Sequence, residues 1–210
     1  MKVLIGTTNP AKVKRFAEFL PDSGIEFLTL QDLGITAEPE ESGSNPEENA
    51  RIKAAFYGQY CDRVICNDSG LYFDCIPMSD PRQPGLNIRT PQGKRLDDEE
   101  MISYYSALIH ELGGKTEAYY LDGIAVYREG RIETYLDERG KWASFYMVEE
   151  PSPNRHPGWP LDSLSVNKNT MTYFVDHRNN IYDPVEDHVM IGEYRRRVVA
   201  FLKKALCVDS

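Results

Sequence analysis

Short apolar segments alternate with helical patterns in the first third of the chain, and this alternation constrains the fold more than any other feature. Residues 2–6 and 64–66 are apolar runs with β-branched side chains, and residues 26–30 form another strand candidate. Apolar side chains at helical spacing fall between them, at residues 10–20 and 46–60. Strands separated by helices are typical of parallel sheets, so the sequence predicts an α/β fold.

The second half of the chain predicts antiparallel strands. A helix capped by Asp97 or Asp98 is expected to run to Leu112, and Glu129-Gly130 favours a hairpin turn. Helices together with hairpins predict a mixed sheet flanked by helices. The other expected elements are strands at residues 71–75, 117–121, 124–127, 132–136, 142–148 and 173–175 and a helix at 192–206.

Two segments without periodicity are expected to be loops. Residues 76–97 are rich in proline and glycine and predict a long surface loop, for which a lid is one candidate role. Residues 151–162 are dense in proline and aromatic side chains. Trp159 in this loop is a candidate for stacking on a ligand, and the alternative is an aromatic side chain that covers the core.

Composition restricts the compartment and the partners. The net charge of -9 argues against a nucleic-acid or membrane surface, which would be basic. The apolar run near the N-terminus is too short for a signal peptide, and no run approaches the roughly 20 residues of a membrane span. The cysteines lack C-x-x-C spacing and are expected to be buried thiols. We therefore expect a cytoplasmic protein with a single domain over residues 1–210.

Two polar stretches predict phosphate chemistry. The loop at residues 6–12 joins a strand to a helix, so its backbone N–H groups can face an anion, although it lacks P-loop spacing. Its alternative role is structural, with Asn9 as the helix cap. Between residues 40 and 71, acids at both ends of a helical segment can converge on Mg²⁺, which takes one or two carboxylates plus phosphate oxygens. These acids are Glu40, Glu41, Glu47, Glu48 and Asp68, with Lys53 among them.

Structural roles remain open for two of the acids. Asn45-Pro46 is typical of a helix start, which places Glu48 at the third helical position. Asp68 follows a strand and precedes an expected tight Ser69-Gly70 turn. It is either a catalytic carboxylate at a strand end or a turn-forming aspartate.

Three motifs in register resemble the family of inosine/xanthosine triphosphate pyrophosphatases, which cleave non-standard purine nucleoside triphosphates to the monophosphate and pyrophosphate. The resemblance covers about the first 75 residues. The motifs are T-x-N-x-x-K at Thr7, Asn9 and Lys12; E-E-[ST]-G with E-N-A-x-x-K-A at Glu40, Glu41, Ser42, Gly43, Glu48, Asn49, Ala50, Lys53 and Ala54; and D-D-S-G-L at Asn67, Asp68, Ser69, Gly70 and Leu71.

The sequence also departs from the family pattern. Asn67 stands for the first Asp of D-D-S-G, and Arg15 stands where the family usually has Glu. Pro84-Gly85-Leu86-Asn87-Ile88-Arg89 only partly matches P-G-x-Y-S-A-R. Gly158-Trp159-Pro160-Leu161-Asp162 resembles G-F-G-[YW]-D, and Glu193-Tyr194-Arg195 replaces S-H-R. The triphosphate and metal motifs are therefore kept, while the base-reading motifs are rewritten.

The resemblance implies a two-lobed fold with a long central mixed sheet, a cleft between the lobes and a homodimer. It implies that Lys12 and Lys53 hold phosphates and that Glu41 and Asp68 bind Mg²⁺. Asp68, with Lys53 beside it, would be catalytic by orienting or deprotonating the attacking water. The implied substrate ligands are Thr7, Asn9, Lys12, Asn49, Ser69 and Gly70, with Asn9 and the loop amides as neutral donors, together with Trp159, Asp162 and Arg195 for the base.

Two alternatives to this function stay open. Asn67, Arg15 and the altered segment Glu193-Tyr194-Arg195 favour a nucleotide-binding sensor that keeps the fold and has lost hydrolysis. The altered base motifs favour a pyrophosphatase for another modified nucleotide. The histidines show no metal-ligand spacing and are expected to be surface or hydrogen-bonded side chains; they are His110, His156, His177 and His188.

Overall fold

The computed structural model describes residues 1–21, 23–137, 144–178 and 185–208, and it divides into two compact units. The first unit comprises Met1–Ser69, Asp122–Asp137 and Val189–Ser210, and the second comprises Gly70–Leu121 and Glu138–His188. Two long strands, β3 (Arg63–Phe73) and β4 (Lys115–Arg128), contribute residues to both units. The single domain over residues 1–210 stays a prediction.

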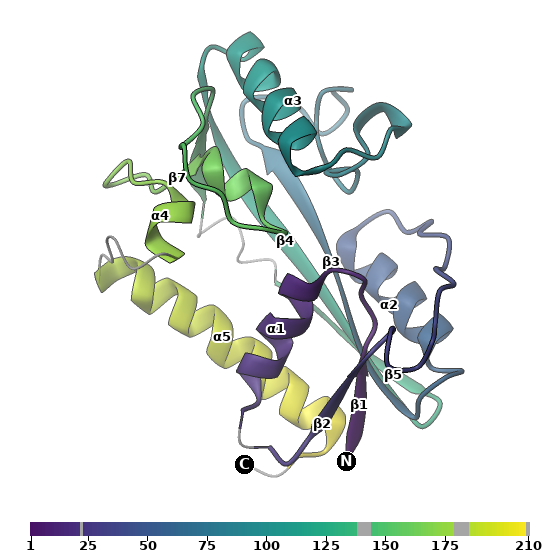
Figure 1. Cartoon of the computed structure of the whole chain (residues 1–210). Helices are drawn as coiled ribbons and strands as arrows, with labels where there is room; N and C mark the ends of the chain where they lie inside the picture. Colours follow the sequence, from purple (N-terminus) through teal and green to yellow (C-terminus); the bar gives the residue numbers. More distant parts are fainter. Residues whose placement is uncertain (22, 138–143, 179–184, 209–210) are drawn as a thin grey trace. The chain divides into compact units, whose positions relative to one another are not determined.

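The first unit carries the predicted alternation of strands and helices (Figure 1). β1 (Lys2–Ile5) pairs in parallel with both β2 (Glu26–Thr29) and β3. The remaining elements are α1 (Pro10–Phe19), α2 (Pro46–Tyr57), β5 (Arg131–Leu136) and α5 (Val185–Leu206). β4 and β5 form the predicted hairpin, in which Glu129 and Gly130 take positive φ values of 50° and 86°. A turn with two positive φ angles matches the twist of the flanking strands.

Burial on both faces explains why β1 is a continuous apolar run. On one face, Val3 and Ile5 of β1 pack in a cluster with α1 and α5, represented by Phe16 and Leu202. On the other face, Leu4 packs in a cluster with the small α2 residues Ala50 and Ala54. Figure 1 shows α1 and α5 on the side of β1 opposite to α2. Alternate residues of one strand therefore face different helices, as in other sheets covered on both faces.

The second unit is antiparallel. β6 (Phe145–Val148) pairs with both β4 and β7 (Ser165–Val166). The helix α3 (Asp98–Glu111) begins with a capping box between Asp97 and Glu100, which confirms the cap predicted from the sequence. The hydrophobic core of this unit includes Phe73, Tyr105 and Met147. The other elements are η1 (Pro91–Gly93), η3 (Pro160–Ser163) and α4 (Phe174–Arg178).

The strand order β2-β1-β3-β4-β6-β7, with β5 beside β4, combines parallel and antiparallel pairs. The predicted α/β class with a central mixed sheet flanked by helices is confirmed. None of the helices in the part of the chain that the structure describes is long and apolar enough to cross a membrane.

The structure corrects several predicted elements. β3 continues through residues 67–70, where a tight turn was expected, because the side chains of Asn67 and Ser69 hydrogen-bond to Asp122 of β4 and keep the backbone extended. β4 is likewise one strand where two were expected. The strand expected at 173–175 is a single bridge at Tyr173 followed by α4, and α5 begins earlier than expected, at Val185. Residues 142–143 of the expected strand at 142–148 lie outside the described residues.

Two loop and thiol predictions have different outcomes. Within residues 76–97, the Gln83 side chain accepts from Phe73 N at 2.7 Å and donates to Phe73 O at 3.0 Å, as a neighbouring strand would. This segment is thus tied to β3, and its role as a lid stays a prediction.

Cys66 is buried as expected, with burial raising the pKa of its thiol to about 12. The prediction is wrong for Cys75 and Cys207, which are exposed.

Candidate active site

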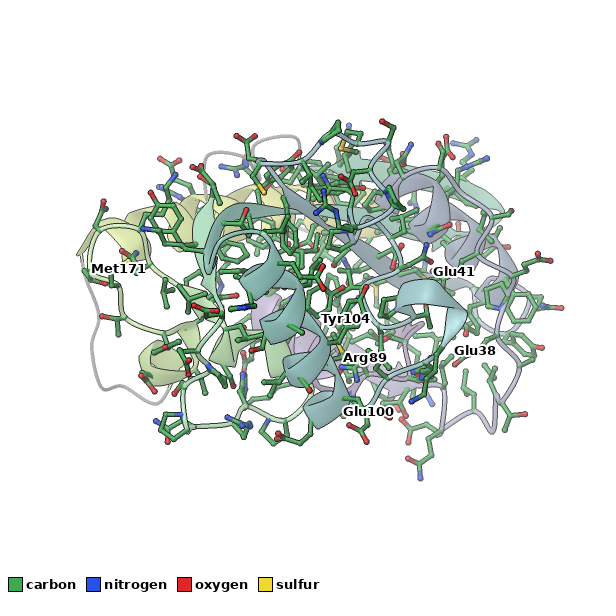
Figure 2. All side chains as sticks on the ribbon, turned by 90° about the horizontal axis from the view of Figure 1, so that it is seen from above. Glu38, Glu41, Arg89, Glu100, Tyr104 and Met171 are labelled. Atoms are coloured by element: carbon green, nitrogen blue, oxygen red, sulfur yellow. The ribbon has the colours of Figure 1, made fainter. Side chains whose placement is uncertain are left out.

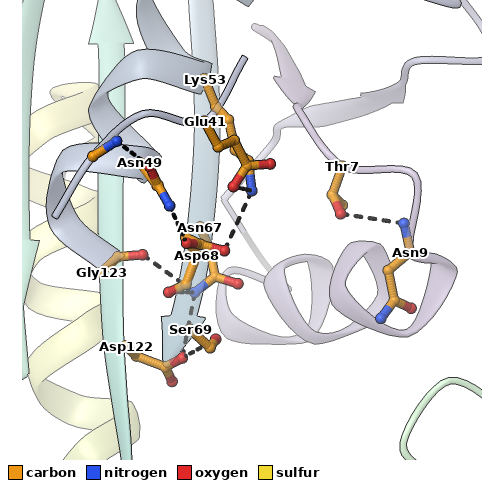
Figure 3. Close-up of polar contacts among 11 residues, drawn as sticks. Thr7, Asn9, Glu41, Asn49, Lys53, Asn67, Asp68, Ser69, Asp122 and Gly123 are labelled. Carbon is orange, nitrogen blue, oxygen red and sulfur yellow. Dashed lines mark hydrogen bonds and ion pairs between the residues drawn. The ribbon is translucent and has the colours of Figure 1, made fainter. Parts of the chain in front are cut away.

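The start of α2 fixes the face that carries the motif residues. The Asn45 side chain accepts from Glu48 N at 2.9 Å, so the predicted cap is confirmed. Glu48 accepts from Ser44 N at 2.7 Å, and Glu47 accepts from the Thr134 hydroxyl of β5 at 2.6 Å. These two acids therefore anchor the helix locally. Asn49, in contrast, is turned toward β3 (Figure 3).

Lys53 brings the two predicted metal ligands together. Its Nζ lies 2.9 Å from Glu41 Oε2 and 3.4 Å from Asp68 Oδ1 (Figure 3). Burial opposes the charge on Lys53, but the carboxylates of Asp68 and Glu41 outweigh it and hold its pKa above the ordinary value. Lys53 and Asp68 are 15% and 13% exposed, whereas Glu41 is 39% exposed. Glu41 is thus the carboxylate with more freedom to turn toward a ligand.

Asn49 holds the acidic loop and the catalytic candidate at once. Its Oδ1 accepts from Gly43 N at 2.8 Å, and its Nδ2 donates to Asp68 Oδ2 at 3.0 Å. A side chain at Gly43 would not fit, because its Cβ would lie 2.6 Å from Asn49 Oδ1 and 2.8 Å from Asn49 N. The glycine of E-E-S-G therefore permits the close approach that carries Glu41 to this site. Figure 2 shows Glu41 and Glu38 on the same loop.

The first motif presents a lysine from α1. The Asn9 side chain caps the helix by accepting from Ala11 N at 2.9 Å, and Asn9 N donates to the Thr7 hydroxyl at 3.2 Å. Lys12 follows in the first turn. Burial, together with the positive charges of Lys53 and Arg15, lowers its pKa to about 8, although Asp68 and Asp122 counteract this. The charged form of Lys12 is destabilised in this environment, and an anionic ligand would stabilise it.

The sequence did not single out Asp122, which the structure places among the motif residues. It accepts hydrogen bonds from Ser69 Oγ at 2.5 Å and from the Tyr194 hydroxyl at 2.8 Å, and Arg15 lies 3.6 Å away. Burial opposes the charge of Asp122, but Arg15 and these hydrogen bonds hold its pKa below the ordinary value. The available signal was an acid in the interior of an apolar strand pattern, between Leu121 and Ile124.

The predicted base-binding residues have contacts within their own units. In the second unit, the rings of Trp159 and His156 stack at 6.4 Å, and His156 Nδ1 lies 3.1 Å from a carboxylate oxygen of Asp162, a buried residue. In the first unit, Arg195 donates to Glu18 O and lies over the Phe19 ring. The roles of Trp159, Asp162 and Arg195 in base recognition stay predictions.

The second unit also holds an ion pair near the loop of Trp159. Asp98 accepts from Arg89 at 2.8 Å and from Gly158 N at 3.1 Å, so the partly matching motif around Arg89 is joined to the start of α3 and to this loop. Figure 2 labels Arg89 with Glu100 and Tyr104 of α3.

Of the other histidines, His110 lies 2.5 Å from Glu149 and is exposed, as expected. The side chains of His177 and His188 lie outside the described residues.

The donor set fits a hard divalent cation. Among the residues that the structure describes, no group of three or more His, Cys, Asp or Glu side chains converges. Two carboxylates, Glu41 and Asp68, do converge on one ammonium group. Mg²⁺ is commonly bound by one or two carboxylates together with waters and substrate phosphates, so this pair is sufficient for a site completed by a nucleotide.

Comparison with known proteins agrees with the motifs. The Ham1 family matches residues 3–173. A dITP/XTP pyrophosphatase of Bacillus subtilis is 32% identical over 160 residues, which cover 69% of this chain and 77% of the relative. One of Thermoanaerobacter pseudethanolicus is 30% identical over 155 residues, covering 67% and 75%.

Solved structures share the fold. A HAM1 protein from Coxiella burnetii aligns with a TM-score of 0.71 at 20% identity over 98% of this chain and 100% of that one. The Staphylococcus aureus Ham1 protein aligns with a TM-score of 0.67 at 19% identity over 97% and 99%. With the family match spanning most of the sequence and the motif residues assembled in the structure, the chain belongs to the Ham1 family.

Proposed function

We propose that this protein is a nucleoside triphosphate pyrophosphatase that hydrolyses a non-standard purine nucleoside triphosphate, of the inosine or xanthosine type, to the monophosphate and pyrophosphate. The curated relatives named dITP/XTP pyrophosphatase support the reaction and the substrate class. The single observation that carries the proposal is the meeting of Glu41 and Asp68 at Lys53, with Asn49 bonded to Asp68.

The lysines bind the polyphosphate in this proposal. The positive charge of Lys53 is one of the causes that lower the pKa of Lys12, which supports binding of one ligand by both ammonium groups. Each acts as a point charge with rotatable donors, which suits a flexible phosphate chain. Asn9 and the backbone amides of its loop add neutral donors, and Thr7, Asn49, Ser69 and Gly70 are the other proposed substrate ligands. The negative phosphates offset the repulsion between the two positive lysines. This gain in electrostatic energy favours the bound nucleotide.

Asp68 orients or deprotonates the water that attacks the α-phosphorus. Its two oxygens are held by different donors, Oδ2 by Asn49 and Oδ1 by Lys53, which fixes the plane of the carboxylate. The charge that builds on the phosphate oxygens is stabilised by Lys12 and Lys53. Glu41 and Asp68 would hold Mg²⁺, which supplies charge neutralisation at the phosphates.

The base, the assembly and the compartment belong to the same proposal. Trp159 would stack on the base, while Asp162 and Arg195 would meet its edge. A homodimer is implied by the resemblance to the family, and a cytoplasmic location by the composition. The sensor alternative is favoured by Asn67 and Arg15, and a pyrophosphatase for another modified nucleotide by the rewritten base motifs.

A screen for released pyrophosphate tests these alternatives. The purified protein is incubated with ITP, dITP, XTP and the ordinary triphosphates, each with Mg²⁺ or with EDTA. We expect pyrophosphate from the inosine and xanthosine substrates, at rates at least roughly tenfold above ATP and GTP, and only with Mg²⁺. Nucleotide binding without pyrophosphate release from any substrate would support the sensor and contradict the proposal.

A further inference from the structure

Asp122 lies on β4, the strand beside β3, and contacts the residues that precede and follow Asp68 in the sequence. Asp122 Oδ1 accepts from Ser69 Oγ at 2.5 Å and is 3.4 Å from Asn67 Nδ2 (Figure 3). Asn67 Nδ2 also donates to Asp68 O at 3.0 Å and to Gly123 O at 3.2 Å. One carboxylate oxygen thus holds β3 on either side of Asp68.

The geometry of a strand makes this arrangement effective. Side chains of successive residues point to opposite faces, so Asn67 and Ser69 share the face opposite to Asp68. Asp122 binds that face, while Asn49 and Lys53 bind the Asp68 carboxylate itself. The backbone of Asp68 and its carboxylate are therefore fixed from two sides.

The second oxygen of Asp122 is held by elements far away in sequence. Tyr194 of α5 donates to Oδ2 at 2.8 Å, and Arg15 of α1 lies 3.6 Å from the same oxygen. A buried carboxylate needs such partners, because an unpaired charge in this environment would be strongly destabilising. Asp122 is therefore a fixed anchor rather than a freely rotating acid.

The two departures from the family motifs also fit this anchor. Asn67 Nδ2 faces three oxygens, one from the Asp122 carboxylate and two from the backbone carbonyls of Asp68 and Gly123. A carboxylate at position 67 would face these oxygens with no proton to donate, whereas the amide donates to them. Arg15 in turn supplies the positive charge that balances Asp122. Asn67 and Arg15 are thereby consistent with an active site.

We propose that Asp122 is a positioning residue that orients Asp68 for attack by holding Asn67 and Ser69. This inference rests on the proposed pyrophosphatase function. Asp122 itself touches neither the substrate nor the reacting atoms in this assignment. Its removal loosens the strand that aims the catalytic carboxylate, and small misplacements of a reacting group lower turnover by one to two orders of magnitude.

The experiment compares Asp122→Ala and the isosteric Asp122→Asn with the wild type in steady-state pyrophosphate release from ITP or XTP with Mg²⁺. We expect kcat to fall by roughly 10- to 100-fold for Asp122→Ala, with KM within about threefold, because substrate contacts remain. The matched control is Asp137→Asn, which alters another buried aspartate of the same unit that pairs with Arg197 at 3.1 Å. The control should keep kcat within about twofold.

A double-mutant cycle with Ser69→Ala tests whether Asp122 acts through the strand. The cycle is evaluated in kcat, because Ser69 is also a proposed substrate ligand and its loss can change KM. If Asp122 acts through the strand, the kcat of the double variant is little lower than that of the worse single variant, since both changes break the same contact. The proposal would be overturned if the fold-losses in kcat of the two single variants multiplied in the double variant. It would also be overturned by an unchanged kcat in both Asp122 variants or by a rise in KM alone. Equal kcat losses in Asp122→Asn and Asp137→Asn would overturn it as well, because they indicate a general effect of losing a buried ion pair.

Amide hydrogen exchange separates this inference from the proposed function. The rate of the wild type tests the pyrophosphatase assignment, whereas exchange at Asn67, Asp68 and Ser69 requires no turnover. We expect exchange at these amides to accelerate at least roughly tenfold in Asp122→Asn, while β1 keeps its protection. Unchanged exchange would overturn the inference even if the wild type is an active pyrophosphatase.

Discussion

At the scale of single residues, the site places charges where the fold alone would not favour them. Lys12 is the clearest case, because burial and the positive charges of Lys53 and Arg15 lower its pKa to about 8 despite the opposing effect of Asp68 and Asp122. A lysine with a lowered pKa is destabilising in its charged form. Residues kept under such conditions are frequently functional, and an anionic substrate would relieve this destabilisation.

Replacing Lys12 should therefore stabilise the protein while impairing substrate binding. Between pH 8 and about 10.5 the unfolded chain holds the Lys12 proton and the folded protein does not, so the contribution of Lys12 to stability rises with pH in this window. We expect Lys12→Met to raise the free energy of unfolding at pH 7 by roughly 1–2 kcal/mol, a value discounted for partial solvent access. KM for the triphosphate should rise at least roughly tenfold.

Urea unfolding at pH 7.0 and pH 9.5 checks this prediction. The gain from Lys12→Met should shrink at the higher pH, where the folded wild type has already lost the Lys12 proton. Lys14→Met is the control, since Lys14 is 78% exposed, and it should change stability by no more than about 0.5 kcal/mol. A gain that does not depend on pH would show that the charge of Lys12 is not its cause.

In the proposed mechanism, Asp68 is the residue that orients or deprotonates the attacking water. Asp68→Asn keeps the size of the side chain but removes the charge that orients or deprotonates water. We expect kcat to fall by well over ~100-fold in pyrophosphate release with Mg²⁺ present. The control Asp32→Asn changes an exposed aspartate that accepts from Thr29 and should leave kcat unchanged. A variant at Asp68 that keeps most of its activity would remove this residue from the mechanism.

At the scale of elements, α2 is seated directly on β4. An added Cβ at Gly123 would lie 2.3 Å from Glu47 N and from Pro46 C, so only glycine lets the start of α2 approach the strand. Thr134 of β5 bonds Glu47 from the same hairpin. The position of α2 decides where Asn49 and Lys53 lie.

Gly123→Ala should therefore damage both stability and activity. Because backbone atoms would have to move, we expect a loss of roughly 1–3 kcal/mol in urea unfolding, the usual cost of overpacking. The kcat for pyrophosphate release should fall more than the folded fraction does, since Asn49 and Lys53 shift. Gly192→Ala is the matched control: Gly192 lies within α5, and among the described residues no atom other than its own helix backbone lies within 4 Å of its Cβ position, so alanine should be neutral or stabilising. Full activity in Gly123→Ala would contradict this role of α2.

The elements also show what a sequence can predict. The sequence predicted a helix cap at Asn45 and at either Asp97 or Asp98, and it gave capping as the alternative role of Asn9, because the signal of a cap is local. The structure has caps at Asn9, Asn45 and Asp97. A turn was wrongly predicted at Asn67–Gly70 because asparagine, aspartate, serine and glycine are typical turn residues. Here the polar side chains instead hydrogen-bond to β4. Long-range partners decide such cases, and Asp122 is separated from Ser69 by 53 positions in the sequence. The motif residues were found from the sequence, while the anchor that holds them was not.

At the scale of the whole molecule, an acidic protein must bind a polyanion. The net charge of -9 opposes the approach of a triphosphate, so the proposed function requires the local lysines and a metal that Glu41 and Asp68 would hold. Stabilisation of the folded protein by nucleotide should consequently depend on Mg²⁺. This dependence can be measured on the intact chain without any turnover.

Thermal unfolding with a non-hydrolysable inosine triphosphate analogue makes the test. At a free ligand concentration of about 100 times Kd, the stabilisation is about 2.7 kcal/mol, which corresponds to an increase of roughly 5–10 °C in Tm for a chain of this size. We expect most of this increase to disappear with EDTA, and to disappear also in Glu41→Gln, which keeps the side-chain volume but removes one ligand charge. Glu26→Gln, an exposed residue paired with Lys2 at 3.3 Å, is the control and should respond as the wild type does. An equal Tm increase with and without Mg²⁺ would mean that the lysines alone hold the polyphosphate and that Glu41 and Asp68 do not form a metal site.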